Sequence, residues 1–313
     1  MLLEELGGST SLTRVFFMEY QTHYSGHFHV ITEILYKRKT KFQEVLVAKI
    51  PDLGVALIID GKIQSTTKDK YIYHETLVHP ILFSHPRPQN ILIIGGGEGA
   101  TAREALKHDP VKVDMVDIDE TVLNLVKKYM PSLCRNVFND KRLNLVIKDG
   151  RRFIESLQTG IYDTIIIDVT DPLPTSPSYR LYTKEFYHAV ASALKEDGLM
   201  VTQATSTYYS RDFFFSVIKT LREEFPIVSP FATWVPSYGS LWGFVIGSKR
   251  YDPTTLTDRL IEERINERGV DDLEYYSSTF HKALFVLPYD LFSKIISGQG
   301  DIITDDSPKY VPI

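Results

Sequence analysis

The chain has 313 residues, of which 43% are hydrophobic and 24% charged, proportions typical of a globular protein and unlike those of disordered or fibrous chains. A net charge of -5 disfavours a general nucleic-acid-binding role, because phosphate binding favours a basic surface. No apolar run approaches the ~20 residues of a membrane span, and the single cysteine, Cys134, excludes intrachain disulfides and thiolate metal clusters. We therefore expect a cytoplasmic protein that binds neither nucleic acid nor membranes.

The first part of the chain has the short-period pattern of β-strands. It begins with MLLEELGGST, which lacks the basic flank of a signal peptide. Phe28–Tyr36 and Glu44–Ile50 then mix β-branched and aromatic residues with alternating polar ones. Asp60-Gly61 is a turn signal that predicts a hairpin between Val55–Ile59 and Lys62–Gln64. We expect a small antiparallel β domain over residues 1–70.

From residue 71 the pattern changes to alternating helices and strands. Tyr71–Phe83 predicts a helix, which Pro86 and Pro88 end. The expected strands are 91–94, 111–116, 143–147, 162–168 and 198–203, with helices at 100–108, 119–129, 150–157 and 182–195 between them. Runs such as Ile165–Ile167 predict strands buried on both faces. We therefore expect an α/β domain over residues 71–313, with an open, doubly wound sheet that binds its ligand beyond the carboxyl ends of the strands.

A glycine-rich turn follows the first of these strands. Gly95, Gly97 and Gly99 would let a ligand approach the backbone closely. Asp117 lies about 20 residues further on, at the end of the next strand, where a carboxylate would hold ribose hydroxyls. Glu98, inside the turn, would repel phosphate. The pattern therefore favours a nucleoside ligand with a positive charge nearby over a plain tight turn.

Further carboxylates follow the third and fourth strands. Asp149-Gly150 is either a common turn or a contact to an adenine amino group. Asp168 and Asp171 end a buried strand, where the plain alternative is a helix cap or a loop acid. Carboxylates in this place can bind an ammonium group or accept a proton.

The histidines do not predict a metal site. His23, His27 and His29 match no metal-ligand spacing, and no cysteine or acid completes them. His74 and His79 are five residues apart and would not share a helix face. We expect no metal and no resident cofactor.

In order along the chain, these motifs resemble the spermidine synthase family of polyamine aminopropyltransferases. The resemblance runs from about Phe17 to Gly247. It is carried by Leu57–Gln64, Tyr73-His74-Glu75, Gly95–Gly99 with Arg103-Glu104, Val116–Asp119, Asp149-Gly150, Asp168–Pro172, Leu181–Thr183 and Val235–Tyr238.

The resemblance implies a fold and a reaction. The fold is an N-terminal β domain followed by a methyltransferase-like Rossmann domain. The reaction moves the aminopropyl group of decarboxylated S-adenosylmethionine, the co-substrate, to an amine and releases methylthioadenosine. Glu98, usually Asp in relatives, would pair with the donor ammonium and repel the carboxylate of ordinary S-adenosylmethionine.

Site roles follow from the same resemblance. Asp168 would be the catalytic carboxylate, with Tyr73 helping to orient the amine. The expected donor-binding residues are Gln43, Gly95, Gly97, Glu98, Asp117, Asp149 and Gly150. The expected acceptor-binding residues are Gln64, His74, Asp171, Tyr238 and Glu19. Family members are oligomers, so a homodimer or homotetramer built through the β domain is expected.

Two matters stay open at the level of the sequence. The loop Leu173–Arg180 departs from the usual pattern and is similar to the thermospermine synthase branch. The acceptor is therefore putrescine or a longer amine such as spermidine, norspermidine or an agmatine derivative. An S-adenosylmethionine-dependent methyltransferase and a non-catalytic polyamine or nucleoside binder are the alternative functions. The segment after residue 250 indicates no role.

Overall fold

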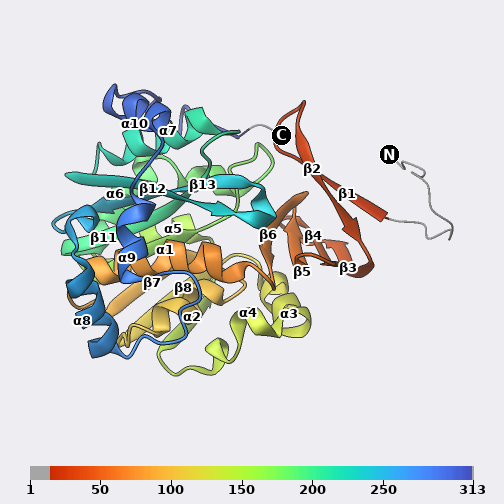
Figure 1. Ribbon diagram of the computed structural model, residues 1–313, viewed down its shortest axis with the longest axis horizontal. Helices are drawn as coiled ribbons and strands as arrows, with labels where there is room; N and C mark the ends of the chain where they lie inside the picture. Colours follow the sequence, from red (N-terminus) through yellow and green to blue (C-terminus); the bar gives the residue numbers. More distant parts are fainter. Residues whose placement is uncertain (1–14, 312–313) are drawn as a thin grey trace.

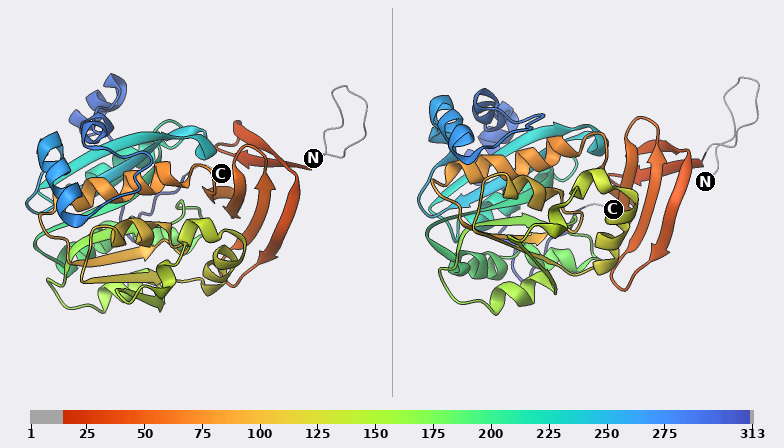
Figure 2. Two further views of the ribbon diagram at one scale, coloured as in Figure 1. Left: turned by 60° about the horizontal axis from the view of Figure 1, so that its bottom comes forward. Right: turned by 90° about the horizontal axis from the view of Figure 1, so that it is seen from below.

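Six antiparallel strands stand at one end of the molecule, beside a larger α/β unit (Figures 1 and 2). The computed structural model describes residues 15–311, so the start of the predicted β domain and the MLLEELGGST segment lie outside the described residues. β1 (Val15–Tyr20) pairs with β2 (Gly26–Ile31). A four-stranded sheet follows in chain order, formed by β3 (Glu33–Lys39), β4 (Glu44–Ile50), β5 (Gly54–Ile59) and β6 (Lys62–Thr66). The predicted antiparallel β unit is confirmed.

One detail of this unit differs from the expectation. The run Phe28–Tyr36 is not one strand, because the chain bends at Thr32 and passes from the β1–β2 pair into the four-stranded sheet. The amide and the hydroxyl of Thr32 both donate to the carbonyl of Lys49, at 3.0 and 3.3 Å, which fixes the bend. The hairpin around Asp60-Gly61 forms as expected between β5 and β6.

The larger unit is built on a mixed seven-stranded sheet with the order β12-β13-β11-β10-β7-β8-β9. All its pairings are parallel except those of β13 with β11 and β12. The strands are β7 (Asn90–Gly95), β8 (Lys112–Asp117), β9 (Leu143–Ile147), β10 (Tyr162–Asp168), β11 (Leu194–Ser206), β12 (Ile227–Val235) and β13 (Ser240–Ser248). The five predicted strands are present, and the β12–β13 hairpin extends the sheet beyond them.

Helices cover both faces of this sheet. One face carries α1 (Lys70–Ser84), α2 (Ala100–Leu106), α8 (Asp258–Arg268) and α9 (Ser278–Leu284). The other carries α5 (Gly150–Glu155), α6 (Lys184–Ala193), α7 (Arg211–Leu221) and α10 (Tyr289–Ile296). α3 (Glu120–Tyr129) and α4 (Pro131–Cys134) lie near the N-terminal strands (Figure 1). Short 3-10 turns span Val137–Asn139, Pro177–Leu181, Pro236–Tyr238 and Pro253–Thr255.

The strands of the large sheet are continuous apolar runs because both faces of the sheet are buried. Ile91 and Ile93 of β7 pack into the cluster under α1 and α2, whereas Leu92 and Ile94 pack into the cluster under α5 and α6. Successive side chains of one strand thus meet two separate apolar layers. The sheet is doubly wound, as predicted. A domain boundary at residue 70, between β6 and α1, stays a prediction.

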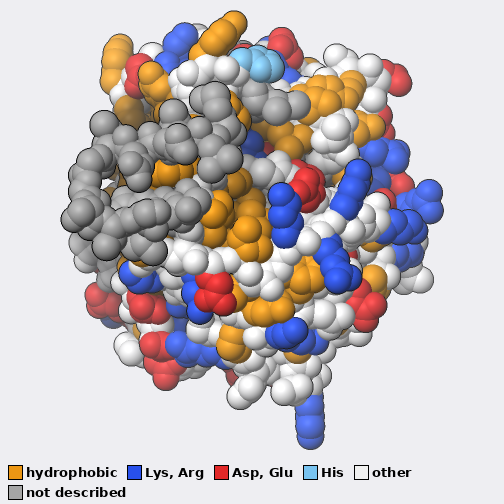
Figure 3. All heavy atoms as spheres, turned by 90° about the vertical axis from the view of Figure 1, so that its right-hand side faces the viewer, with side chains coloured by type: hydrophobic (Ala, Val, Ile, Leu, Met, Phe, Trp, Pro, Cys, Tyr) orange, Lys and Arg blue, Asp and Glu red, His pale blue; other side chains and the backbone are white. Residues whose placement is uncertain are grey.

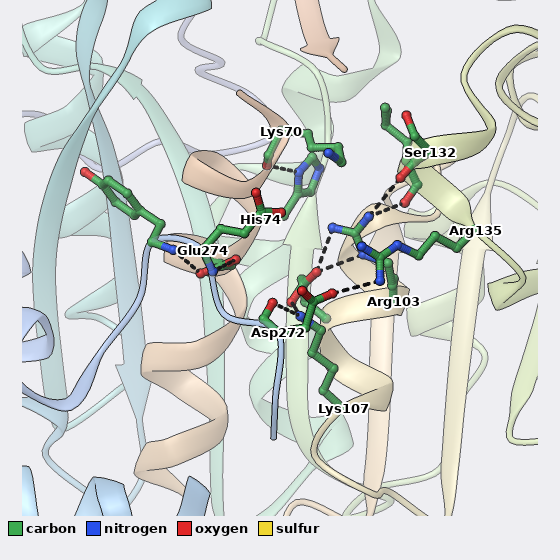
Figure 4. Close-up of polar contacts among 12 residues, drawn as sticks. Lys70, His74, Arg103, Lys107, Ser132, Arg135, Asp272 and Glu274 are labelled. Carbon is green, nitrogen blue, oxygen red and sulfur yellow. Dashed lines mark hydrogen bonds and ion pairs between the residues drawn. The ribbon is translucent and has the colours of Figure 1, made fainter. Parts of the chain in front are cut away.

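The C-terminal segment is tied to the back of α1 and α2. The buried carboxylate of Glu75 accepts the backbone N–H groups of Glu274, Tyr275 and Tyr276 at 2.8–2.9 Å. Asp272 pairs with Arg135 at 2.8 Å, and Figure 4 shows this contact beside the labelled Glu274. Within residues 15–311, no helix is both long and apolar enough to cross a membrane.

Candidate active site

A pocket opens where the carboxyl ends of β7, β8 and β10 face the N-terminal strands. Its lining includes every predicted site residue except His74, namely Glu19, Gln43, Gln64, Tyr73, Gly95, Gly97, Glu98, Asp117, Asp149, Gly150, Asp168, Asp171 and Tyr238. The position agrees with the rule that open α/β sheets bind ligands beyond the carboxyl ends of their strands.

The glycine turn after β7 packs closely against the ends of β8 and β10, where its glycines leave no room for a Cβ atom. Gly95 has φ +85°, and a Cβ atom there would lie 2.0 Å from the carbonyl oxygen of Asp168. A Cβ atom on Gly97 would lie 2.7 Å from a carboxylate oxygen of Asp117. The amide of Gly96 donates to the Asp168 carbonyl at 2.8 Å. The glycines therefore let the ends of β7, β8 and β10 meet around the ligand space.

Glu98 is held from behind by His74. Nδ1 of His74 lies 2.6 Å from the carbonyl oxygen of Lys70, a contact drawn in Figure 4, and Nε2 pairs with the Glu98 carboxylate. Burial disfavours the charged imidazole, but attraction and hydrogen bonding from Glu98 outweigh this and raise the pKa of His74. Because His74 is buried outside the pocket lining, the contacts favour a positioning role toward Glu98. Its predicted contact with the acceptor stays a prediction.

Asp117 ends β8 and faces the glycine turn. Burial raises the pKa of Asp117 to about 6, although the N–H groups of Asp119 and Gly97 oppose the shift. The neighbouring Asp119 accepts hydrogen bonds from Thr40 at 2.7 Å and from the side chain of Gln43 at 3.1 Å. The loop between β3 and β4 is thereby fastened to the Rossmann-like unit, which places Gln43 on the pocket.

Asp149 has a structural role as well as a place on the pocket. Its carboxylate caps the N-terminus of α5 and accepts the amide of Arg152 at 3.0 Å. Asp149 is thus a helix cap and Gly150 the first residue of α5, not the plain turn that the sequence also allowed, and a contact with adenine stays a prediction.

Two hydroxyl groups orient the carboxylate of Asp168. One oxygen accepts the Tyr73 hydroxyl at 2.8 Å, and the other accepts the hydroxyl of Thr101 from the first turn of α2. Burial and the nearby Asp168 charge hold the pKa of Tyr73 well above its usual value, so Tyr73 remains a neutral donor. The Asp168 carboxylate is thus fixed at the boundary between the glycine turn and the N-terminal strands.

The end of the pocket beyond Asp168 is acidic. Glu19 is only 3% exposed, and burial raises its pKa to about 7 while Lys62 opposes the shift. Burial also raises the pKa of Asp171, again against Lys62 and against a hydrogen bond from Gln203. Buried carboxylates of this kind are stabilised when a cationic ligand binds beside them. We refer to Glu19, Asp171, Lys62 and their surroundings as the acidic end.

Tyr238 and Gln64 close one side of the acidic end. The Tyr238 hydroxyl donates to the Gln64 carbonyl at 2.5 Å, and the Tyr238 ring packs edge-on against Tyr73. The turn that carries Tyr238 is anchored because the amide of Ser237 donates to Asp69 at 2.8 Å. The hairpin β12–β13 thereby contributes to a site made mostly by the parallel strands.

The loop after Asp171 is braced by the C-terminal segment. Arg151, 6% exposed, donates to both carboxylate oxygens of Asp305 at 3.1 and 2.9 Å. Asp305 also accepts the hydroxyl of Thr183 at 2.7 Å, and the amide of Val311 donates to the Pro172 carbonyl at 3.1 Å. The segment that indicated no role in the sequence thus supports the loop that lines the pocket.

Replacing Asp305 with Ala is expected to loosen this loop and to lower the free energy of unfolding by about 1–2 kcal/mol, because charged hydrogen bonds to Arg151 are lost. Urea unfolding measures the stability, and limited proteolysis measures opening of residues 172–183. Asp306→Ala, at an exposed neighbouring carboxylate, is the control. Equal protease resistance in the two variants would contradict the brace.

Sequence reasoning missed three side chains that the structure brings to the site. Lys62 lay within a recognised motif, Thr101 follows the glycine turn, and Gln203 donates to the carbonyl of Val169 at 3.0 Å. The motif around Lys62 could have signalled a role, and so could the segment Val201–Ala204 around Gln203, which is also similar to the thermospermine synthase branch. Across residues 15–311, no group of three His, Cys, Asp or Glu side chains is arranged to hold a metal ion.

The fold and the pocket define an α/β protein whose candidate active site lies at the carboxyl ends of the parallel strands and has an acidic end. Residues 15–67 match the spermidine synthase tetramerisation domain, and residues 70–258 match the spermine/spermidine synthase domain. A polyamine aminopropyltransferase of Saccharolobus solfataricus is 45% identical over 300 residues, covering 94% of this chain and 97% of the relative. Polyamine aminopropyltransferase 2 of Hyperthermus butylicus is 43% identical over 88% of this chain and 90% of its own length.

Solved structures agree. A spermidine synthase in complex with the transition-state analogue AdoDATO has a TM-score of 0.84 and 32% identity, covering 95% of this chain and 98% of that one. The spermidine synthase of Thermotoga maritima has a TM-score of 0.82 and 31% identity, with the same coverage. The chain belongs to the spermidine synthase family and is an aminopropyltransferase of that type.

Proposed function

We propose that the protein transfers the aminopropyl group of decarboxylated S-adenosylmethionine to a small polyamine and releases methylthioadenosine. The observation that carries the proposal is one pocket with two chemically different ends. The glycine turn and Asp117 suit a nucleoside, whereas Glu19 and Asp171 suit an ammonium group. Asp168 lies between them.

The donor is proposed to lie along the glycine turn. Asp117 and Gln43 would hold the ribose, and the region of Asp149 and Gly150 would receive the adenine. The donor ammonium would pair with Glu98, whose carboxylate lines the pocket and is steadied by His74. The carbon next to the sulfonium would then point toward Asp168.

The chemistry is a displacement at that carbon. The acceptor amine needs a free electron pair, so one proton of its ammonium group must leave first, and Asp168 is proposed to orient the amine and accept the proton. The nitrogen forms a bond to carbon while the carbon–sulfur bond breaks, and its electron pair stays on sulfur as the neutral thioether. Positioning and electrostatic stabilisation supply most of the catalysis.

An amine-competition assay tests the proposal. Purified protein is incubated with decarboxylated S-adenosylmethionine and an equimolar panel of diamines and triamines, and mass spectrometry follows methylthioadenosine and each product. We expect methylthioadenosine together with aminopropylated amine. Absence of methylthioadenosine with every amine, alongside transfer of a methyl group from S-adenosylmethionine, would overturn the proposal.

The pKa of Asp117 gives a pH prediction. Because the proposed ribose contact needs the carboxylate, methylthioadenosine affinity should be constant above about pH 6 and fall toward tenfold per pH unit below it. Titration calorimetry between pH 5 and 8 measures this. Asp117→Asn, which cannot titrate, should bind weakly at every pH. A wild-type affinity that does not change over this range would contradict the role of Asp117.

A homo-oligomer built through the N-terminal strands is also proposed. Hydrophobic side chains gather on this face of the molecule (Figure 3). Those exposed on β1 and β2 include Val15, Phe16, Met18 and Phe28, which are 40–64% exposed. Apolar patches of this kind mark contact surfaces, and the match to a tetramerisation domain supports the same surface. Light scattering coupled to size-exclusion chromatography measures the mass, and a monomer at micromolar concentration would contradict this proposal.

A further inference from the structure

The acidic end contains a lysine of its own. Lys62 begins β6, is 9% exposed and lines the same pocket as Glu19 and Asp171. Its ammonium group donates to the backbone carbonyl of Tyr20. In the part of the chain that the structure describes, Lys62 has no carboxylate oxygen within 4.0 Å, so it is not consumed in a direct ion pair.

The positive charge of Lys62 nevertheless reaches both carboxylates. It is the largest influence that opposes the burial-raised pKa of Glu19, and also of Asp171. The other basic residues on the pocket are Arg151 and Arg180, and Arg151 is paired with Glu155 and Asp305. Lys62 is therefore the cation that acts on the acidic end before any substrate enters.

We propose that Lys62 is a specificity-determining residue that restricts the acidic end to a single ammonium group of the acceptor, so that diamines are preferred over triamines. Glu19 is partly protonated at neutral pH, and an ammonium group that enters beside it favours the carboxylate form. With an ammonium group bound, two carboxylates and one fixed lysine therefore leave one negative charge to match it. Gln21, Gln64 and Gln203, which also line this part of the pocket, add no charge. The inference rests on the proposed function and names the acceptor class.

The charges of the acceptors explain the preference. The attacking nitrogen must be neutral beside Asp168, so a diamine brings one remaining ammonium group and a triamine brings two. The first ammonium group is matched by the uncompensated carboxylate. A second one would be held in a buried space beside Lys62, where repulsion between like charges is far stronger than in water.

The test removes the charge of Lys62 in two ways. Lys62→Met removes the charge and the donor, and Lys62→Gln keeps a donor for the Tyr20 carbonyl. Values of kcat/KM are measured for 1,3-diaminopropane, putrescine and spermidine at saturating decarboxylated S-adenosylmethionine. We expect the spermidine-to-putrescine ratio to rise at least about tenfold in both variants. Lys62→Arg should keep the wild-type ratio.

A matched control is available on the surface. Lys68 also donates to a backbone carbonyl, that of Pro51 at 3.0 Å, but does not line the pocket, so Lys68→Met should leave the ratio unchanged. A purely structural Lys62, tying β6 to β1, would lower turnover of all amines alike and leave the ratio at the wild-type value.

The outcomes distinguish a failure of the proposed function from a failure of the proposed role of Lys62. No methylthioadenosine from the wild-type protein with any amine contradicts the proposed function itself. Turnover by the wild type with a preference for spermidine overturns the role of Lys62, and so does an unchanged ratio in the Met and Gln variants. A raised ratio in both neutral variants, retained diamine preference in Lys62→Arg and no change in Lys68→Met support it.

Discussion

Replacing Asp168 with Asn is expected to lower kcat by about 10²–10⁴-fold while leaving the fold and donor binding intact. Asn is nearly the same size and can still contact Tyr73 and Thr101, which hold the carboxylate in the native protein. It cannot accept a proton from the acceptor amine. Steady-state release of methylthioadenosine measures kcat, and calorimetry with methylthioadenosine measures binding.

Two further variants make this prediction specific. Tyr73→Phe removes one of the two hydrogen bonds that orient Asp168 and should lower kcat by a smaller factor, about 10-fold. Asp52→Asn, at an exposed carboxylate away from the pocket, should have no effect. An Asp168→Asn enzyme within a few-fold of wild-type kcat at neutral pH would leave Asp168 with only a binding role.

Much of the architecture could be predicted because local pattern and tertiary structure agree in the parallel strands. Ile91–Ile94 and Ile165–Ile167 are apolar on both faces, and both faces are in fact covered by helices. The glycine turn could also be predicted from the sequence. Gly95 and Gly97 occupy positions where the backbone of β10 and the side chain of Asp117 leave no room for a Cβ atom, so these positions require glycine.

Other features depend on contacts between residues far apart in the chain. Asp305 meets Arg151 from 154 positions away, and Glu75 meets the amides of 274–276 from about 200 positions away. Neither pair has a periodicity or spacing of its own. The β12–β13 hairpin and the C-terminal helices likewise become interpretable only when their partners on the sheet are known.

His74 is a single residue whose contacts could not be predicted from its motif. The motif Tyr73-His74-Glu75 sits on one helix, yet its three side chains have different destinations. Tyr73 donates to Asp168 on the pocket. His74 pairs with Glu98 from outside the pocket, and Glu75 binds the C-terminal segment. Successive residues of a helix point about 100° apart, so adjacency in a motif does not imply a shared ligand.

The selectivity for the decarboxylated donor is expected to depend on Glu98. Replacing Glu98 with Gln removes the negative charge that the donor ammonium would meet, and should raise KM for decarboxylated S-adenosylmethionine by roughly 10–100-fold, in line with the loss of a charged, partly buried contact. Competition by ordinary S-adenosylmethionine should become stronger, because its carboxylate would no longer be repelled. Inhibition constants for ordinary S-adenosylmethionine, set against KM for the decarboxylated donor, measure the change.

The control separates charge discrimination from general damage to the donor site. Asp149→Asn alters a different carboxylate on the same pocket and should change affinity for both donors by the same factor. In Glu98→Gln the pKa of His74 should fall as well, because the charge of Glu98, the largest influence that raises it, is gone while burial still lowers it. If the ratio between the two donors is the same as in the wild type while the His74 pKa has fallen, Glu98 serves only to hold His74. Discrimination would then have to come from the shape of the pocket or from Asp117 and Asp168, the other carboxylates beside the glycine turn.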